Sequence, residues 1–230
     1  MALYAIGDLH LSLSVDKPMD IFGEAWVQHE EKIKESWLAQ VSEEDMVLIP
    51  GDISWATTFE DAKVDLAWID ALPGTKVLLR GNHDYWWTSL KRMNEAFPNM
   101  VFIQNNFYEY KTHIICGTRG WICPTKQNFD AHDEKIYKRE LIRLKLSLDS
   151  AKKATDKPIL VITHYPPTND SFEPSGFTEI YESYGVEKVI YGHLHTEVSF
   201  KCGLQGEHGG VDYHLVSSDY VQFQLQKILD

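Results

Sequence analysis

Five short apolar runs in this 230-residue chain each end at a polar residue that can bind a metal ion or transfer a proton. The runs cover residues 3–6, 46–49, 77–79, 158–163 and 188–191. Amphipathic segments typical of helices follow the first three runs, at residues 29–41, 60–71 and 86–97. Strands that alternate with helices in this way predict a largely parallel sheet that is buried on both faces.

The rest of the chain predicts more strands, two further helices and no boundary between domains. Strand-like segments cover 101–104, 107–110 and 113–117. In the C-terminal part, antiparallel strands are expected at 197–202, 211–217 and 220–226, with a hairpin turn at Gly209-Gly210. The clearest helix spans 131–153, with Asp130 as a candidate N-cap, and a shorter one covers 177–184. Because no linker interrupts the chain, we expect a single α/β domain over residues 1–230.

The polar residues that follow the five apolar runs are expected to meet in one crevice. Sites in open α/β sheets collect at the carboxyl ends of the strands, and glycines just before these residues let the backbone turn sharply there. Two pairs have i, i+2 spacing, which in an extended chain points both side chains the same way. The residues are Asp8 and His10, Asp52, Asn82 with His83 and Asp84, His164, and His193 with His195.

These residue types suit two divalent metal ions with mixed nitrogen and oxygen ligands. Imidazole suits Zn, Fe and Mn, and carboxylate suits Mn. Asp52 stands alone at its strand end, so it is the best candidate for a carboxylate that bridges the two ions. Two divalent ions bring more positive charge than Asp8 and Asp52 return, so the site suits an anionic substrate such as a phosphate ester. The metals would also make a bridging hydroxide available at neutral pH.

The blocks that contain these residues occur in a specific order. They are Gly7-Asp8-Leu9-His10, Gly51-Asp52, Gly81-Asn82-His83-Asp84, Thr163-His164 and Gly192-His193-Leu194-His195. In order and rough spacing they resemble the five signature blocks of the calcineurin-like metallophosphoesterase superfamily, whose bacterial-type members are dinuclear-metal phosphohydrolases. The resemblance spans residues 7–195 and implies a four-layer α/β/β/α sandwich of two facing mixed sheets.

The resemblance also implies a role for each residue. One metal ion would be held by Asp8, His10, Asp52 and His195, and the other by Asp52, Asn82, His164 and His193. His83 would protonate or stabilise the leaving-group oxygen, and Asp84 would orient it. One position departs from the purple acid phosphatases of this superfamily, in which a Tyr that binds ferric iron follows the bridging Asp by three residues. Here that position holds Trp55, which cannot ligate.

Three further residues are candidates for contact with the substrate, each with a structural alternative. His29 lies in a polar-aromatic stretch that could reach over the site, or it packs a helix. Trp86, beside Trp87, could form an aromatic wall for the leaving group, or it packs the start of a helix. Arg119 lies between glycines in a loop and could bind phosphate through two hydrogen bonds, or it is a surface residue.

Composition narrows the partners that we expect. The 22 Lys and Arg against 34 Asp and Glu give a net charge of −12, which argues against long nucleic acids and anionic lipids but leaves short or single nucleotides open. No apolar run approaches the length of a membrane span, and the opening strand-like segment has no basic stretch before it, so we expect no signal peptide. The odd set Cys116, Cys123 and Cys202 indicates reduced thiols, so we expect a cytoplasmic protein.

We therefore expect a metal-dependent phosphoesterase that acts on a small phosphomonoester or phosphodiester. The main alternative is a nuclease or cyclic-nucleotide phosphodiesterase of the same superfamily. A remote alternative is a non-catalytic scaffold with this fold, which the presence of His83 and every metal ligand argues against. The natural substrate, the native metal and the oligomeric state do not follow from the sequence.

Overall fold

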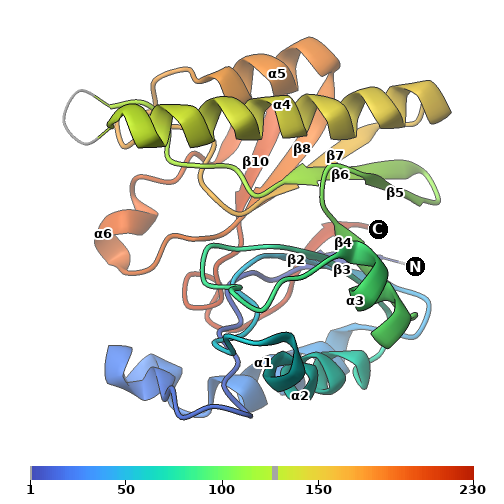
Figure 1. Ribbon diagram of the computed structural model, residues 1–230, viewed down its shortest axis with the longest axis vertical. Helices are drawn as coiled ribbons and strands as arrows, with labels where there is room; N and C mark the ends of the chain where they lie inside the picture. Colours follow the sequence, from blue (N-terminus) through green and yellow to red (C-terminus); the bar gives the residue numbers. More distant parts are fainter. Residues whose placement is uncertain (1, 126–128) are drawn as a thin grey trace.

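Two β-sheets face each other in the middle of the protein, and helices cover their outer faces (Figure 1). This computed structural model describes residues 2–125 and 129–230. The layers follow the order helix, sheet, sheet, helix, so the predicted α/β/β/α architecture of two mixed sheets is confirmed.

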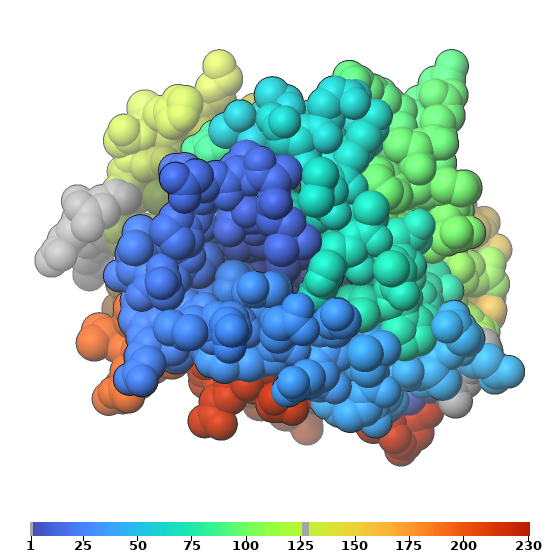
Figure 2. Space-filling model, turned by 90° about the horizontal axis from the view of Figure 1, so that it is seen from below, coloured from blue at the N-terminus to red at the C-terminus, as the bar shows by residue number. Residues whose placement is uncertain are grey.

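The first sheet has five strands in the order β11-β1-β2-β3-β4. Strands β1 to β4 run parallel, and β11 pairs antiparallel with β1. Helices α1 and α2 cover its outer face, and Figure 2 shows this side of the molecule, built mainly from the first half of the chain. The bounds are β1 (Leu3–Ala5), β2 (Met46–Pro50), β3 (Thr75–Leu79), β4 (Met100–Ile103), β11 (Gln226–Leu229), α1 (His29–Gln40), α2 (Phe59–Asp70) and α3 (Leu90–Ala96), with 3₁₀ turns η1 (Met19–Phe22) and η2 (Glu24–Trp26).

The second sheet has six strands in the order β5-β6-β7-β8-β10-β9. Its four central strands run parallel, and β5 and β9 pair antiparallel at the two edges. Helices α4 and α5 cover its outer face. The bounds are β5 (Phe107–Tyr110), β6 (His113–Thr118), β7 (Ile159–Thr163), β8 (Val186–Tyr191), β9 (Gly206–His208), β10 (Val211–Leu215), α4 (Ala131–Ala154), α5 (Gly176–Tyr184) and α6 (Glu197–Phe200).

The side chains of strand β7 pack into two hydrophobic cores, one on each face of the second sheet. Leu160 and Ile162 lie in the core between the two sheets. Ile159 and Val161 lie in the outer core under α4 and α5. Successive side chains of a strand point to opposite faces, so a run buried on both sides must be apolar at every position. This explains why the runs read from the sequence are continuous rather than alternating.

Helix α4 forms where the periodicity predicts it. Asp130 caps its N-terminus: its side chain accepts hydrogen bonds from the amides of His132 and Asp133, and the Asp133 side chain accepts one from the Asp130 amide. Leu144 and Leu148 on one face are fully buried against the second sheet. The predicted N-cap and the buried face of this helix are confirmed.

Four details of the predicted elements are wrong. The third helix begins at Leu90 rather than at residue 86, because Ser89 caps it and the two tryptophans before it are buried in a turn. Residues 197–200 form the short helix α6 instead of a strand. The last strand is β11, at residues 226–229, so most of the segment 220–226 is turn. Strand β10 pairs parallel with β8, although its turn with β9 at Gly209-Gly210 is the predicted hairpin.

Two predictions about the chain as a whole can be compared with the structure. Among the described residues no helix combines the length and apolarity that crossing a bilayer requires. Cys116, Cys123 and Cys202 are free thiols. Cys116 and Cys123 are buried, and burial raises the pKa of each thiol to about 12.

Candidate metal centre

The seven side chains predicted to bind metal ions lie together at the carboxyl ends of β1, β2, β3, β7 and β8. Six of them form two compact groups, in each of which the candidate ligand atoms lie within 4.8 Å of one another. Asn82 joins the second group, because its Oδ1 lies 2.7 Å from Nε2 of His164. The first group is Asp8, His10 and His195, and the second is Asp52, His164 and His193.

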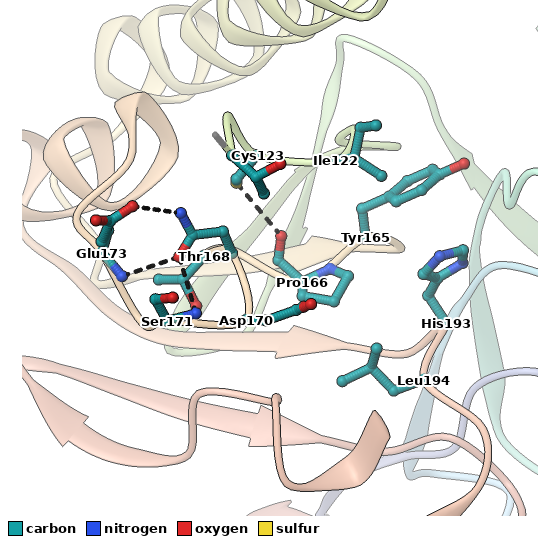
Figure 3. A pocket seen from close by; sticks show the side chains of 12 residues that line it. Ile122, Cys123, Tyr165, Pro166, Thr168, Asp170, Ser171, Glu173, His193 and Leu194 are labelled. Atoms are coloured by element: carbon teal, nitrogen blue, oxygen red, sulfur yellow. Dashed lines mark hydrogen bonds between the residues drawn. The ribbon is translucent and has the colours of Figure 1, made fainter. Parts of the chain in front are cut away.

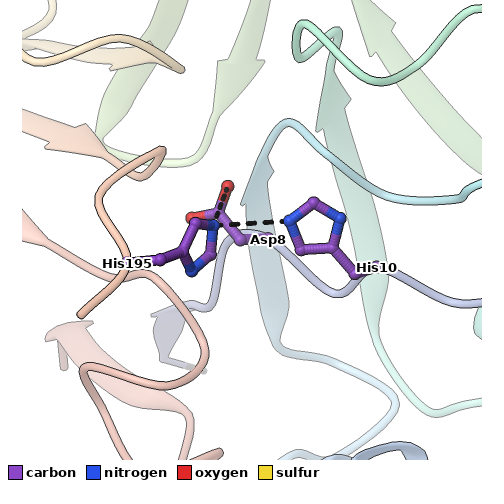
Figure 4. A group of neighbouring side chains, drawn as sticks. All are labelled: Asp8, His10 and His195. Atoms are coloured by element: carbon purple, nitrogen blue, oxygen red, sulfur yellow. Dashed lines mark hydrogen bonds and ion pairs between the residues drawn. The ribbon is translucent and has the colours of Figure 1, made fainter. Parts of the chain in front are cut away.

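Imidazole nitrogens face each other in both groups. Nε2 of His10 lies 3.4 Å from Nε2 of His195, beside the Asp8 carboxylate (Figure 4). Nε2 of His164 lies 3.1 Å from Nδ1 of His193. A cation bound by both nitrogens accounts for such a contact, because each lone pair then points at positive charge.

Asp52 lies between the two groups. Its Oδ2 is 3.8 Å from Nε2 of His10 in the first group and 3.5 Å from Nε2 of His164 in the second. Its other oxygen, Oδ1, accepts a hydrogen bond of 2.8 Å from the amide of His83, which fixes the orientation of the carboxylate. One carboxylate oxygen is thus within reach of cations in both groups, as a bridging ligand requires.

The protonation of three of the four candidate histidines suits metal binding. Burial lowers the pKa of His10, of His193, and of His164, the last to about 3. These rings are therefore neutral at physiological pH, with lone pairs available for a metal ion. His195 differs: although burial lowers its pKa, the hydrogen bond with Asp219 and the charge of Asp8 raise it to about 9.

Burial outweighs the positive charge of His195 at both carboxylates of the centre. Burial raises the pKa of Asp8 to about 7 and raises that of Asp52. Oδ1 of Asp8 is buried and has no hydrogen-bond partner among the described residues. A buried carboxylate oxygen without a partner is costly unless a cation satisfies it. The donor set and this orphaned oxygen both fit a pair of divalent cations.

The backbone at the ligands is strained. Asp8, His10, Asp52 and His193 have φ angles of 56°, 45°, 49° and 73°, in the left-handed region that non-glycine residues rarely adopt. Such conformations cost on the order of 1–3 kcal/mol each and concentrate at functional sites. They also correct the expectation from i, i+2 spacing: Asp8 and His10 converge because the loop turns at both residues, and not because the chain is extended.

Two glycines permit the close approach of neighbouring loops. A Cβ atom at Gly81 would collide with the side chain and amide of Asp52, and one at Gly192 would collide with the carboxylate of Asp8. Neither glycine has a positive φ, so close packing is what requires glycine there. These contacts hold the loops after β3 and β8 against the two aspartates.

His83 lies at the edge of the two groups and is only partly buried. Its ring centroid is 4.5 Å from that of Trp55 and 5.8 Å from that of His10. The ring is thus beside the first group and accessible from solvent.

Asp84 is fully buried and binds main chain. It accepts hydrogen bonds from the amides of Gly81, Ile53 and Ser54 and from the indole of Trp86. Burial raises its pKa to about 7. These contacts fix the loops that carry Asp52 and Asn82. In the part of the chain that the structure describes, its hydrogen bonds go to these groups and not to the His83 imidazole that it was expected to orient.

The structure favours the packing alternative for two of the substrate candidates. His29 is buried, with its two ring nitrogens 3.0 and 3.2 Å from the carbonyl oxygens of Leu9 and Trp26. Trp86 is buried and bonded to Asp84. Arg119 is partly buried beside the centre: its carbonyl oxygen accepts from the His164 amide, while its side chain points into a separate cavity.

Trp55 packs directly on His10, a candidate metal ligand. Its indole stacks on the His10 imidazole, with centroids 4.9 Å apart and planes inclined by 23°. Its Nε1 lies 3.0 Å from the sulfur of Met19. The position that carries a ligating Tyr in purple acid phosphatases therefore supports the His10 ring here.

Asp219 is a site residue that sequence reasoning missed. Its Oδ1 lies 2.9 Å from Nδ1 of His195. It reaches the site because the chain after β10 runs beside the end of β1, where Gly7 and Ser217 form a parallel bridge. The only sequence signal is that Asp219 lies beyond the end of β10, which runs parallel to β8 and so ends at the same edge of the sheet as His193.

A cavity of about 590 Å³ opens beside the second group. His193 and Tyr165 lie at one end of it (Figure 3). Glu173 lies at the other end and Asp170 between them (Figure 3), and its lining includes no Lys or Arg among the described residues. A cavity of this size is typical of sites for small organic ligands.

Comparisons with known proteins agree with this geometry. Among curated proteins, no sequence matches the chain. The solved structures that match its fold include three that are similar to the chain over nearly its whole length. They are the protein of unknown function AQ665 from Aquifex aeolicus (17% identity, TM-score 0.55, 98% of this chain and 95% of that one), the phosphopantetheinyl hydrolase PptH from Mycobacterium tuberculosis (14%, 0.59, 99% and 95%) and the protein TT1561 of Thermus thermophilus (12%, 0.58, 99% and 97%).

The family itself is established by sequence. The family model for calcineurin-like phosphoesterases matches residues 1–197, which include all seven candidate ligands and His83. The chain therefore belongs to the calcineurin-like phosphoesterase family.

Proposed function

We propose that the protein is a hydrolase that uses two divalent metal ions, Mn, Fe or Zn, to cleave a small phosphomonoester or phosphodiester. The position of Asp52 carries the proposal. Its Oδ2 lies within 4 Å of a histidine nitrogen from each group, at 3.8 Å from His10 and 3.5 Å from His164. A shared carboxylate between two nitrogen-rich groups is the arrangement that holds a pair of cations at one substrate.

The residues would divide the work as follows. When bound, the cations supply an activated water and neutralise charge on the phosphoryl oxygens. The first group, the second group and Asn82 hold them. His83, partly exposed beside the first group, donates a proton to the leaving-group oxygen, and the Asp52 carboxylate holds its amide in place.

The cavity beside His193 favours a small substrate whose leaving group carries no further negative charge. Asp170 and Glu173 repel an anionic leaving group, and the described lining includes no Lys or Arg to attract one. A nucleic acid strand, which binds through phosphate contacts to Lys and Arg, is disfavoured on the same ground. A phosphopantetheinyl group, named for the Mycobacterium tuberculosis neighbour, is one test compound of suitable type.

An activity screen tests the proposal. The protein is stripped of metal, reconstituted with Mn²⁺, Fe²⁺ or Zn²⁺ and assayed on an aryl phosphate, a bis-aryl phosphodiester, a cyclic nucleotide, a phosphopantetheinyl compound and a short oligonucleotide. We expect metal-dependent hydrolysis of at least one small ester, with His83→Ala as the inactive control. No hydrolysis with any metal would contradict the proposal and favour a scaffold. A cytoplasmic location, expected from the free thiols, is part of the same proposal.

A further inference from the structure

A second cavity, of about 200 Å³, lies beside the metal centre and shares no lining residue with the larger one in the described parts of the chain. It is bounded by the carboxyl ends of β3, β4 and β6 and by the middle of α4. We call it the arginine cavity. Its lining comprises Leu79, Arg80, Ile103, Gln104, Asn105, Thr118, Arg119, Arg139, Glu140 and Arg143.

The arginine cavity is strongly positive in a chain of net charge −12. Four arginines and one glutamate line it, which leaves a net charge of +3. The glutamate, Glu140, is already occupied. It accepts hydrogen bonds from Thr118 at 2.6 Å and from Arg143 at 2.7 Å, and Arg139 lies 3.6 Å away. Glu140 therefore cannot also neutralise the two remaining arginines.

Those two arginines, Arg80 and Arg119, lack partners for their charge. The Nε atom of each is buried and has no hydrogen-bond partner, and neither guanidinium forms an ion pair within residues 2–125 and 129–230. Arg119 stacks over the Trp121 ring at 4.7 Å, which fixes its plane without satisfying its donors. Burial of cationic donors without an anion is costly, so the arrangement points to a missing ligand.

Burial and neighbouring positive charges destabilise the charged form of Arg119. Burial lowers its pKa, and the charges of Arg80 and Arg139 lower it further, whereas Glu140 raises it. A bound anion would relieve this repulsion.

We propose that the arginine cavity binds a small oxyanion, either a phosphate ion or a single phosphoryl group. Guanidinium groups donate in a planar fork that matches the oxygens of phosphate, and Arg80 and Arg119 have such donors free. The cavity is smaller than sites for drug-sized ligands, which start at about 300 Å³, and its volume suits one tetrahedral anion.

The oxyanion site adjoins the metal centre. Arg80 lies two residues before Asn82, and the carbonyl oxygen of Arg119 accepts from the amides of His164 and Tyr165 at 3.0 and 3.1 Å. Because the arginine cavity lies next to the metal centre, the anion could come from two sources. It is either free phosphate, the product of monoester hydrolysis, or a second phosphoryl group on the substrate. The second source rests on the proposed function, whereas the site itself does not.

Phosphate binding to the metal-free chain tests the site. Inorganic phosphate is titrated calorimetrically into chelator-treated protein at constant ionic strength, so that hydrolysis and metal ions play no part. We expect saturable binding that is at least tenfold weaker in Arg80→Gln and in Arg119→Gln, and Arg80→Lys is expected to recover part of the affinity. Arg92→Gln is the matched control, because Arg92 is exposed on α3, pairs with Glu60 and is not among the residues that line the cavity.

Two results would overturn the site: no binding to folded wild-type protein, or equal affinity in wild type and Arg80→Gln. Melting temperatures measured in chloride, without phosphate, separate lost binding from lost folding.

Kinetics of the Mn²⁺-loaded enzyme then separate the two sources. If the substrate supplies the anion, Arg80→Gln raises the KM of a sugar bisphosphate at least tenfold more than that of 4-nitrophenyl phosphate. If free phosphate is the ligand, both KM values change by the same factor and only the effect of added phosphate is lost. An enzyme inactive on both esters would argue against the monoester branch of the proposed function, while the calorimetric result on the site would stand.

Discussion

Nδ1 of His195 donates a hydrogen bond of 2.9 Å to Oδ1 of Asp219, across 24 residues of sequence. This contact fixes the tautomer of His195 and turns its Nε2 toward His10, 3.4 Å away. A carboxylate behind a metal-binding imidazole also makes the ring a stronger ligand. Asp219 therefore belongs to the candidate metal centre through its contact with His195.

Replacement of Asp219 by Asn is expected to weaken metal binding. A carboxylate that orients a metal-binding histidine typically contributes 10–100-fold to affinity or activity, so a loss of about that size is expected. Competition titration with a metal-sensitive dye measures it. Asp212→Asn is the matched control, because Asp212 forms a similar 2.8 Å contact with His214 outside the site. Equal losses in the two variants would contradict this role.

Removal of the His83 ring is expected to impair turnover and spare the metals. His83→Ala should retain its metal content and lose about 10²–10⁴-fold in kcat, the usual contribution of a general acid. Steady-state kinetics on an aryl phosphate and elemental analysis measure the two quantities. His208→Ala, at an exposed histidine, is the control. Activity equal to wild type would rule out the assigned role.

The bridging role of Asp52 is tested by a substitution that removes its charge and keeps its shape. Asp52→Asn keeps the hydrogen-bond acceptor for the His83 amide but removes the negative charge shared by both groups. We expect it to lose bound metal, measured as ions per chain by elemental analysis after dialysis. Two ions retained per chain would show that Asp52 is not the bridge.

Iron in this site is expected to give no purple colour. The tyrosinate that gives purple acid phosphatases their charge-transfer band has no counterpart here, because Trp55 stacks on His10 in its place. Visible absorption of the ferric protein checks this. A band that disappears on substitution of a nearby tyrosine, such as Tyr165 beside His193, would contradict it.

Acid stability depends in part on Asp45. Its carboxylate accepts hydrogen bonds from the amides of Ala2 and Ser42. Although burial alone raises its pKa, these bonds lower it to about 2. Its stabilising effect is therefore complete above the ordinary pKa near 4 and is lost as the pH falls toward 2. In urea unfolding, the stability difference between wild type and Asp45→Asn should shrink over that window, and a constant difference would contradict the assignment.

Local signals in the sequence predicted the elements that depend on local interactions. Asp130 and the apolar periodicity defined α4, and continuous apolar runs defined the strands of both sheets. The two tryptophans before α3 were misplaced because distant contacts decide their conformation: Trp86 donates to Asp84 and Trp87 to Gln104. Residues 197–200 alternate as a strand would, yet α6 forms there after Thr196 adopts a positive φ.

The candidate site was predictable in its members but not in its geometry. Each ligand follows a strand, and parallel strands present their carboxyl ends at one edge, so convergence follows from topology. The position of Asp219 depends instead on the bridge between Gly7 and Ser217, which joins segments 210 residues apart. Nothing local to either segment encodes that contact. The arginine cavity is hidden for the same reason, because its arginines come from three separate parts of the chain.

An anomalous scattering map from crystals soaked in Mn²⁺ tests the central claim most directly. The account predicts two peaks, one among Asp8, His10 and His195 and one among His164, His193 and Asn82, with Asp52 touching both. A single peak, or none at these side chains, would contradict the dinuclear centre.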